Sequence, residues 1–138
     1  MVGSMDATDA FGEPLPSDQL PPDESFGTRL SRREGVVWLA LGGELDMLTA
    51  PRLRAVLREL TLAPDEALVL DLRGLAFLDS SGLAVILGAH ERAATDGGPP
   101  ARILIRGSAP VEALFATIGA ADYLHLLEDP AEVVGSHH

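Results

Sequence analysis

A short polar sequence, Asp-Ser-Ser-Gly at residues 79–82, joins two apolar segments of different length and pattern. Residues 67–72 before it form an apolar stretch typical of a buried strand. Residues 83–92 after it are long and apolar enough for a largely buried helix. Free backbone N–H groups and the positive end of a helix dipole converge at such a junction. The junction therefore tolerates an added negative charge, and a serine within it is a candidate phosphoacceptor.

Strand and helix patterns alternate from residue 28 onward, which predicts an α/β fold. Strands are expected at residues 28–33, 36–41, 67–72, 102–106 and 123–127, and helices at 49–60, from 83 to about 95, and at 110–118, with a helical turn at 130–134. A turn is expected at Glu34-Gly35, an irregular connection at residues 42–46, and a helix start at Thr49 with Pro51. This order favours a mixed, mainly parallel sheet of about five strands flanked by about four helices.

The first 27 residues differ in composition from the rest of the chain. They carry six acidic residues, four prolines and no basic residue. Such a segment buries too little apolar surface to offset its chain entropy, so we expect a disordered or loosely docked extension. Residues 1–4 within it and residues 135–138 at the other end resemble remnants of an expression tag. The expected domain is therefore residues 28–134.

Composition excludes several classes of function. The chain has no cysteine, so neither a disulfide framework nor a thiolate metal site is expected. Its formal net charge is −11 and all its basic residues are arginines, which gives no cationic footprint for nucleic acid. No apolar stretch approaches the ~20 residues that span a bilayer. We expect a cytoplasmic protein without cofactor, metal or membrane contact, and the sequence does not decide its oligomeric state.

Two short motifs stand in order at the expected strand-to-helix junctions. The first is Gly-Glu-Leu-Asp at residues 43–46, followed by Thr49-Ala50 before a helix. The second is Leu-Asp-Ser-Ser-Gly-Leu at residues 78–83, continued by an apolar helix. In this order and spacing they resemble the STAS-domain anti-sigma factor antagonist family, and the similarity covers residues 28–134.

The resemblance implies a partner-switching role. An unphosphorylated antagonist of this family binds an anti-sigma factor that is itself a serine kinase, and thereby frees the sigma factor. The kinase phosphorylates the first serine after the aspartate, which by position is Ser80, and a serine phosphatase resets the switch. The implied partner-binding residues are Asp46, Glu44, Thr49, Asp79, Ser81 and Gly82.

Structural interpretations compete with these roles. Ser80 and Ser81 are residues that commonly cap helices, and Asp79 is an equally suitable cap. Asp46 is also compatible with an ordinary loop acid, and Gly82 with either close approach of a partner or tight packing on the sheet. His90 and His125 fit structural histidines better than ligands, and Trp38 is expected to pack on one face of the sheet.

An enzyme is disfavoured. Ser80, Asp79 and His90 include the residue types of a hydrolase, but the nucleophile-elbow spacing Gly-x-Ser-x-Gly is absent. The stronger alternative stays within the same fold: a non-switching STAS scaffold of a stress-sensing complex, or an accessory subunit of a transport system. In that case Ser80 would only cap the helix.

Overall fold

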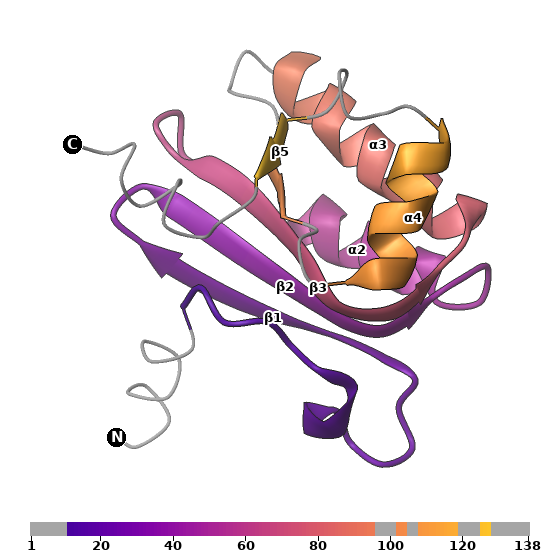
Figure 1. Cartoon of the computed structure of the whole chain (residues 1–138). Coiled ribbons are helices and arrows are strands. Elements are labelled where there is room, and N and C mark those ends of the chain that lie inside the picture. The colour runs from indigo at the N-terminus through magenta and orange to yellow at the C-terminus, as the bar shows by residue number, and fades with distance from the viewer. Residues whose placement is uncertain (1–10, 96–101, 105–107, 119–124, 128–138) are drawn as a thin grey trace.

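The strands form one five-stranded mixed sheet in the order β1-β2-β3-β4-β5 (Figure 1). The computed structural model describes residues 11–95, 102–104, 108–118 and 125–127. Along the chain the elements are η1 (Ser17–Gln19), β1 (Phe26–Arg33), β2 (Val36–Leu45), α2 (Ala50–Glu59), β3 (Ala67–Leu78), α3 (Ser80–Thr95), β4 (Arg102–Leu104), α4 (Ala109–Ile118) and β5 (His125–Leu127). β1 pairs antiparallel with β2, and the other pairs are parallel. The predicted α/β fold with a mainly parallel sheet is therefore confirmed.

The predicted helix count is matched approximately. The described residues contain three α-helices and the short 3-10 helix η1. The helical turn expected at residues 130–134, the strand ends expected at 105–106 and 123–124, and the side chain of His125 lie outside the described residues.

The turn between β1 and β2 follows directly from its two residues. Glu34 has a φ of 50° and Gly35 a φ of 83°. Two successive positive φ angles match the right-handed twist of the flanking strands in a two-residue hairpin loop. The predicted hairpin is confirmed, and the edge strand β1 begins two residues earlier than expected.

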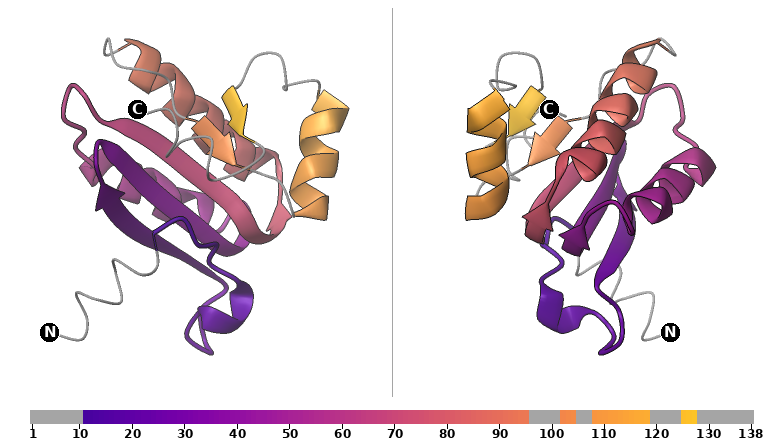
Figure 2. Two further views of the ribbon diagram at one scale, coloured as in Figure 1. Left: turned by 60° about the vertical axis from the view of Figure 1, so that its left-hand side comes forward. Right: turned by 90° about the vertical axis from the view of Figure 1, so that its right-hand side faces the viewer.

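The helices cover one face of the sheet. In β2 and β3 alternate residues point toward them, as the two-residue period of a strand requires. The core on this face includes Val37, Leu39, Leu41, Leu68, Leu70 and Leu72 from the strands, with Leu53 of α2, Ile86 of α3 and Phe115 of α4. Figure 2 shows α2 and the segment that carries η1 on different sides of the sheet.

The second face of the sheet is covered by the N-terminal segment. Trp38, Val36, Ala40 and Val69 form a smaller core with Leu15, and Phe11 and Leu20 pack against it. Trp38 packs on this face, as predicted. Of the two states expected for the extension, disorder is wrong for residues 11–25. Three apolar side chains, and a close approach of the Leu15 backbone to two glycines described below, hold this segment on the sheet.

β2 and β3 both run further than the sequence predicts. Residues 42–45, expected as an irregular connection, continue β2 with register shifts at Ala40/Gly42 and Gly43/Glu44. Gly43 has a φ of 91°, a conformation that favours glycine and is common in bulges. β3 likewise continues to Leu78. These extensions bring β2 to within four residues of α2 and β3 to within one residue of α3.

Candidate functional site

The two motifs meet at the carboxyl ends of β2 and β3. Leu45 pairs with Leu78 in the parallel register, and the Asp79 N–H donates a 3.1 Å hydrogen bond to the Leu45 carbonyl. Asp46 and Asp79 are the next residues of their respective strands, so the starts of α2 and α3 lie side by side. In open α/β sheets this edge is where binding sites gather.

Asp79 is the cap of α3. Its Oδ1 accepts hydrogen bonds from the Ser81 N–H at 2.9 Å and the Gly82 N–H at 3.1 Å. Its carbonyl oxygen accepts the first intrahelical bond, from the Leu83 N–H at 2.9 Å. The sequence left the capping residue undecided among three candidates. The geometry selects Asp79, so the capping interpretation of Ser80 and Ser81 is wrong.

Ser80 occupies the first turn of α3 with its side chain exposed. Within the described part of the chain, its hydroxyl makes no hydrogen bond. Ser81 is half-buried, and its backbone N–H is held by Asp79. Of the two serines, Ser80 is therefore the more exposed.

Asp46 organises the start of α2. Its Oδ1 accepts hydrogen bonds from the Leu48 N–H at 3.0 Å and the Thr49 N–H at 3.0 Å. These bonds, the one from the Thr49 backbone first, hold the pKa of the Asp46 carboxyl below its ordinary value of 3.8, against the opposing effect of partial burial. Asp46 is thus an organising residue of the turn and not a loose loop acid.

Thr49 stands at the N-cap position of α2, as predicted, but its side chain makes no capping hydrogen bond. It is buried, and its hydroxyl donates to the Glu44 carbonyl at 2.8 Å and accepts from the Asp46 N–H at 2.9 Å. Both hydrogen bonds stabilise the end of β2, so the Thr49 hydroxyl has little capacity left to bond a partner. Glu44 itself is exposed, and its backbone N–H donates to the Ser25 carbonyl at 2.7 Å.

The lowered pKa of Asp46 makes a prediction about pH. A carboxyl whose folded pKa is depressed contributes stability above its unfolded pKa and loses it as the pH falls through the folded pKa. Asp46→Asn should therefore show a smaller loss of melting temperature than the wild type between pH about 5 and about 2. Circular dichroism melts measure this, with the exposed Asp65→Asn as control. Equal pH dependence in wild type and Asp46→Asn would contradict the assigned role.

Gly82 lies buried under the ends of the two strands. A Cβ at this position would lie 2.5 Å from Leu45 Cγ and 2.9 Å from Leu78 Cδ1. Of the two roles that the sequence left open for Gly82, the geometry supports tight packing on the sheet. A direct partner contact by Gly82 has no support from its position.

Gly82→Ala is expected to destabilise the fold. Overpacking costs about 1–3 kcal/mol, which outweighs the gain of about 1 kcal/mol from better helix propensity. The matched control is Gly88→Ala in the same helix, where a Cβ would meet nothing within 4 Å. This control should gain up to about 1 kcal/mol. Urea unfolding of the two variants measures the difference, and a Gly82→Ala protein as stable as Gly88→Ala would contradict the packing role.

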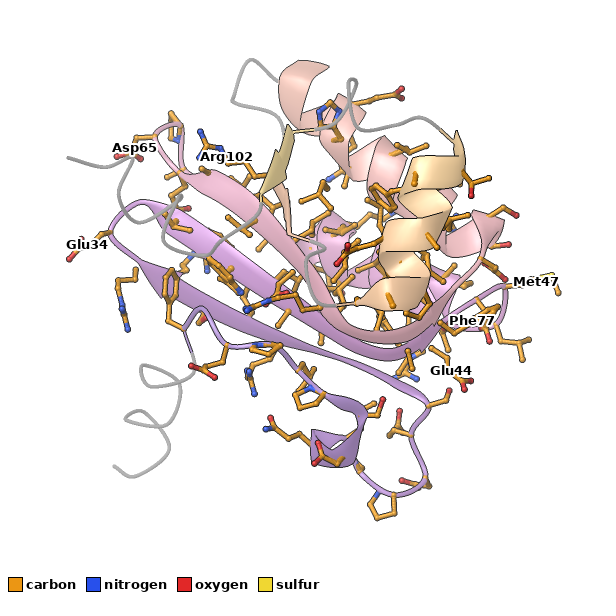
Figure 3. All side chains as sticks on the ribbon, in the orientation of Figure 1. Glu34, Glu44, Met47, Asp65, Phe77 and Arg102 are labelled. Atoms are coloured by element: carbon orange, nitrogen blue, oxygen red, sulfur yellow. The ribbon has the colours of Figure 1, made fainter. Side chains whose placement is uncertain are left out.

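Three large apolar side chains surround the two helix starts. Met47 is 71% exposed, Leu48 81% and Phe77 47%. Phe77 pairs with Glu44 in the register of β2 and β3, and Figure 3 shows Glu44, Met47 and Phe77 at the same end of the molecule. We call Met47, Leu48 and Phe77 the apolar rim. Exposed apolar side chains that cluster in this way typically mark interaction surfaces.

Phe77 was missed as a site residue by the sequence reading. It stands in a stretch that looks like the apolar continuation of a strand. The sequence held no signal for it, because residues 75–78 are all apolar; the structure shows that Leu75 and Leu78 are buried and the two residues between them are exposed. In a regular strand only one of two successive side chains faces outward. Here both Ala76 and Phe77 are exposed.

No metal or membrane-spanning feature occurs in the part of the chain that the structure describes. No group of three potential ligands among histidines, cysteines and acids lies together there. No described helix combines the length and apolarity that crossing a bilayer requires. His90 is buried in α3.

The fold and the site define a small sheet domain that presents two neighbouring helix starts, one of which carries an exposed serine. Residues 28–128 match the family model described as "Mlab, STAS domain". The chain therefore belongs to the STAS-domain family, as the resemblance of its two motifs predicted.

Several relatives carry the name of anti-sigma factor antagonists. The anti-sigma-F factor antagonist RsfB of Mycobacterium tuberculosis is 33% identical over 69 residues, which are 50% of this chain and 57% of RsfB. The match thus spans little more than half the length of that relative. The anti-sigma F factor antagonist of Paenibacillus polymyxa is 36% identical over 85 residues, 55% of this chain and 73% of that protein.

Solved structures agree with the fold. The crystal structure of an anti-sigma factor antagonist from Mycobacterium paratuberculosis superposes with a TM-score of 0.72 at 25% identity, over 85% of this chain and 97% of that chain. The unphosphorylated form of the anti-sigma factor antagonist SpoIIAA gives a TM-score of 0.59 at 20% identity, over 78% of this chain and 93% of that chain.

Proposed function

We propose that this protein is an anti-sigma factor antagonist that acts by partner switching. Its unphosphorylated form binds an anti-sigma factor with serine kinase activity and so frees the sigma factor. The kinase phosphorylates Ser80 and the complex dissociates, after which a serine phosphatase restores the binding form. The protein is a binding partner and a substrate in this scheme, not an enzyme. The names of its relatives in Mycobacterium and Paenibacillus support the antagonist role.

The observation that carries the proposal is the position of Ser80. Its hydroxyl is exposed in the first turn of α3, and Asp79 already caps that helix. A serine that caps a helix would have to break those bonds to react, whereas Ser80 can be modified without loss of the cap. Ser80 can therefore be phosphorylated without loss of the hydrogen bonds that Asp79 makes at the start of α3.

The surroundings of Ser80 favour release after phosphorylation. A phosphate adds about −1.5 to −2 charges at neutral pH. The start of α3 stabilises a nearby anion by about 0.3–1 kcal/mol, but Asp79 and Asp46 stand at the same edge and repel it. The domain thus tolerates the phosphate, while a partner docked over it meets a charged group where a neutral hydroxyl had been.

The apolar rim supplies a reason for binding before phosphorylation. Met47 and Leu48 lie between Asp46 and the start of α2, and Phe77 stands two residues before the cap of α3. A partner that covers the rim removes apolar surface from water and at the same time covers Ser80. The acidic residues Glu44 and Asp46 beside the rim favour a partner with basic residues around an apolar centre.

Intact mass of the full chain after incubation with ATP and each candidate anti-sigma factor kinase tests the proposal. One added phosphate, mapped to the peptide that contains Ser80, is the expected result. The control is Ser80→Ala, which should remain unmodified. Stoichiometric phosphorylation of Ser80→Ala would contradict the assigned site. An unmodified wild type in the presence of kinases proven active would favour the non-switching scaffold or transport-accessory role instead.

A further inference from the structure

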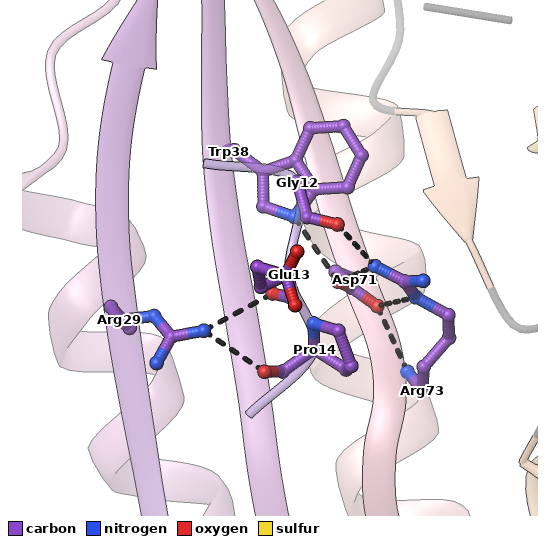
Figure 4. A network of polar contacts seen from close by, with 7 residues as sticks. All are labelled: Gly12, Glu13, Pro14, Arg29, Trp38, Asp71 and Arg73. Atoms are coloured by element: carbon purple, nitrogen blue, oxygen red, sulfur yellow. Dashed lines mark hydrogen bonds and ion pairs between the residues drawn. The ribbon is translucent and has the colours of Figure 1, made fainter. Parts of the chain in front are cut away.

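The second face of the sheet carries a groove that residues 11–20 fill. We call these residues the strap. The strap lies across β2 and β3, on the face opposite to the helices, and the hydrogen bonds made by the backbone of residues 12–14 are drawn in Figure 4. Within the described residues, no backbone–backbone hydrogen bond joins the strap to the sheet. It is held as a bound peptide is held, by arginine side chains of the sheet that donate to its backbone carbonyls and by apolar packing against the sheet.

Two arginines of the sheet bind the strap carbonyls. Arg29 of β1 donates to the carbonyl oxygens of Glu13 at 3.2 Å and Pro14 at 2.9 Å. Arg73 of β3 donates to the carbonyl oxygen of Gly12 at 2.6 Å. Three consecutive carbonyls are thus satisfied by guanidinium donors. Such contacts recognise an extended backbone and do not depend on its side chains.

Two glycines of the strands make room for the strap backbone. A Cβ added at Gly42 or at Gly74 would collide with the carbonyl oxygen of Leu15. At Gly42 the nearest atoms all belong to Leu15, so this glycine clears space for the strap alone. The Leu15 side chain is only 6% exposed, which makes it the central apolar anchor of the strap.

The floor of the groove is a buried polar cluster. Trp38 Nε1–H donates to Asp71 Oδ2 at 3.1 Å, and Arg73 pairs with the same oxygen at 2.8 Å. The Asp71 side chain is fully buried. This cluster fixes the Arg73 guanidinium so that it faces the Gly12 carbonyl. The Phe11 ring packs on the Trp38 ring at a centroid distance of 5.3 Å.

We propose that this groove is a peptide-binding site and that its resident ligand is the chain's own strap. The ligand class is an extended, proline-containing peptide with an aromatic residue and, four positions later, a leucine. The strap meets this description at Phe11 and Leu15. Its attachment through anchors and arginine contacts, without ladder bonds, makes it exchangeable with a peptide of the same kind supplied from outside. This inference does not rest on the function proposed above.

The segment that follows the strap reaches the functional site. After η1 the chain returns to the sheet at Ser25, whose carbonyl accepts the Glu44 N–H at 2.7 Å. Glu24 pairs with Arg52 of α2 at 2.8 Å. Occupancy of the groove is therefore connected, through one short segment, to the end of β2 that carries Asp46.

Binding of a labelled peptide of residues 11–20 to three full-length proteins tests the groove. The first protein is the wild type, and the second is Phe11→Ala/Leu15→Ala, in which the strap binds more weakly. The third is the same double variant with Gly42→Ala added. In the wild type the tethered strap competes at an effective concentration of about 1 mM. Fluorescence anisotropy should show the peptide binding to the strap-weakened variant at least about tenfold more tightly than to the wild type. Addition of Gly42→Ala should abolish that binding.

Trp38 gives a second readout, because it is the only tryptophan of the chain. Its emission should shift to longer wavelength when the strap is weakened and return when the peptide is added. If the double variant does not fold, Phe11→Ala alone offers the same comparison with Leu15 retained. A folded strap-weakened protein that neither binds the peptide nor changes its emission would overturn the proposal. Peptide binding that survives Gly42→Ala would overturn it as well.

Discussion

Ser80→Asp is expected to weaken binding of the proposed anti-sigma factor partner by about a hundredfold or more, whereas Ser80→Ala should bind as the unmodified protein does. An aspartate at this position adds a charge beside Asp79, in the centre of a surface that a partner must cover. Like charges and an unpaired buried charge in an interface cost several kcal/mol, and about 2.8 kcal/mol corresponds to a hundredfold change.

Calorimetry with the partner measures the difference between the two variants. Ser17→Asp is a suitable control, because Ser17 is exposed in η1 and lies outside the candidate site. This control should bind with wild-type affinity. The melting temperatures of Ser80→Asp and the wild type should agree closely, because Asp79 retains the cap. Wild-type affinity of Ser80→Asp would remove the electrostatic basis of the switch.

Asp71→Ala is expected to lower the free energy of unfolding by about 3–5 kcal/mol. The carboxylate is fully buried and accepts hydrogen bonds from Trp38 and from both the backbone and the side chain of Arg73. Its removal leaves a largely buried guanidinium and an indole N–H without their acceptor. Loss of one member of a buried pair is much more costly than loss of both.

Urea unfolding followed by circular dichroism measures this effect. Asp71→Ala combined with Arg73→Met should recover part of the lost stability, because no unpaired charge remains. Glu44→Ala, an exposed acid on the neighbouring strand, should stay within about 0.5 kcal/mol of the wild type. A loss below about 1 kcal/mol for Asp71→Ala would show that water readily reaches Arg73 in its place.

The sequence was sufficient for the fold because its periodicities are strong. The apolar runs of β2 and β3, the glycine turn at Glu34-Gly35 and the alternation of strands and helices all depend on local patterns. The ends of the strands were less predictable. Residues 42–45 contain two glycines, which predict an interruption from propensity alone, but the neighbouring strand β3 supplies the pairing that keeps them extended.

The residues of the site could be predicted from the sequence, but the structural role of each one could not. The sequence identified Asp46, Thr49, Asp79 and Ser80 as a group. It could not tell that Asp79 caps α3 or that Thr49 faces back to Glu44, because both depend on how two strand ends lie beside each other. The strap was mispredicted for a similar reason. Its composition resembles that of a disordered chain, and only the groove formed by distant residues explains its docking.

The hydrogen bond from Asp79 to Leu45 has a consequence for the kinetics of recognition. It fixes both helix starts to one rigid sheet edge, so the surface that presents Ser80 is already ordered before any partner arrives. Little conformational entropy is then lost on association, and the encounter requires no loop to fold. The same rigidity means that a charge placed on Ser80 cannot be moved aside by rearrangement of its loop.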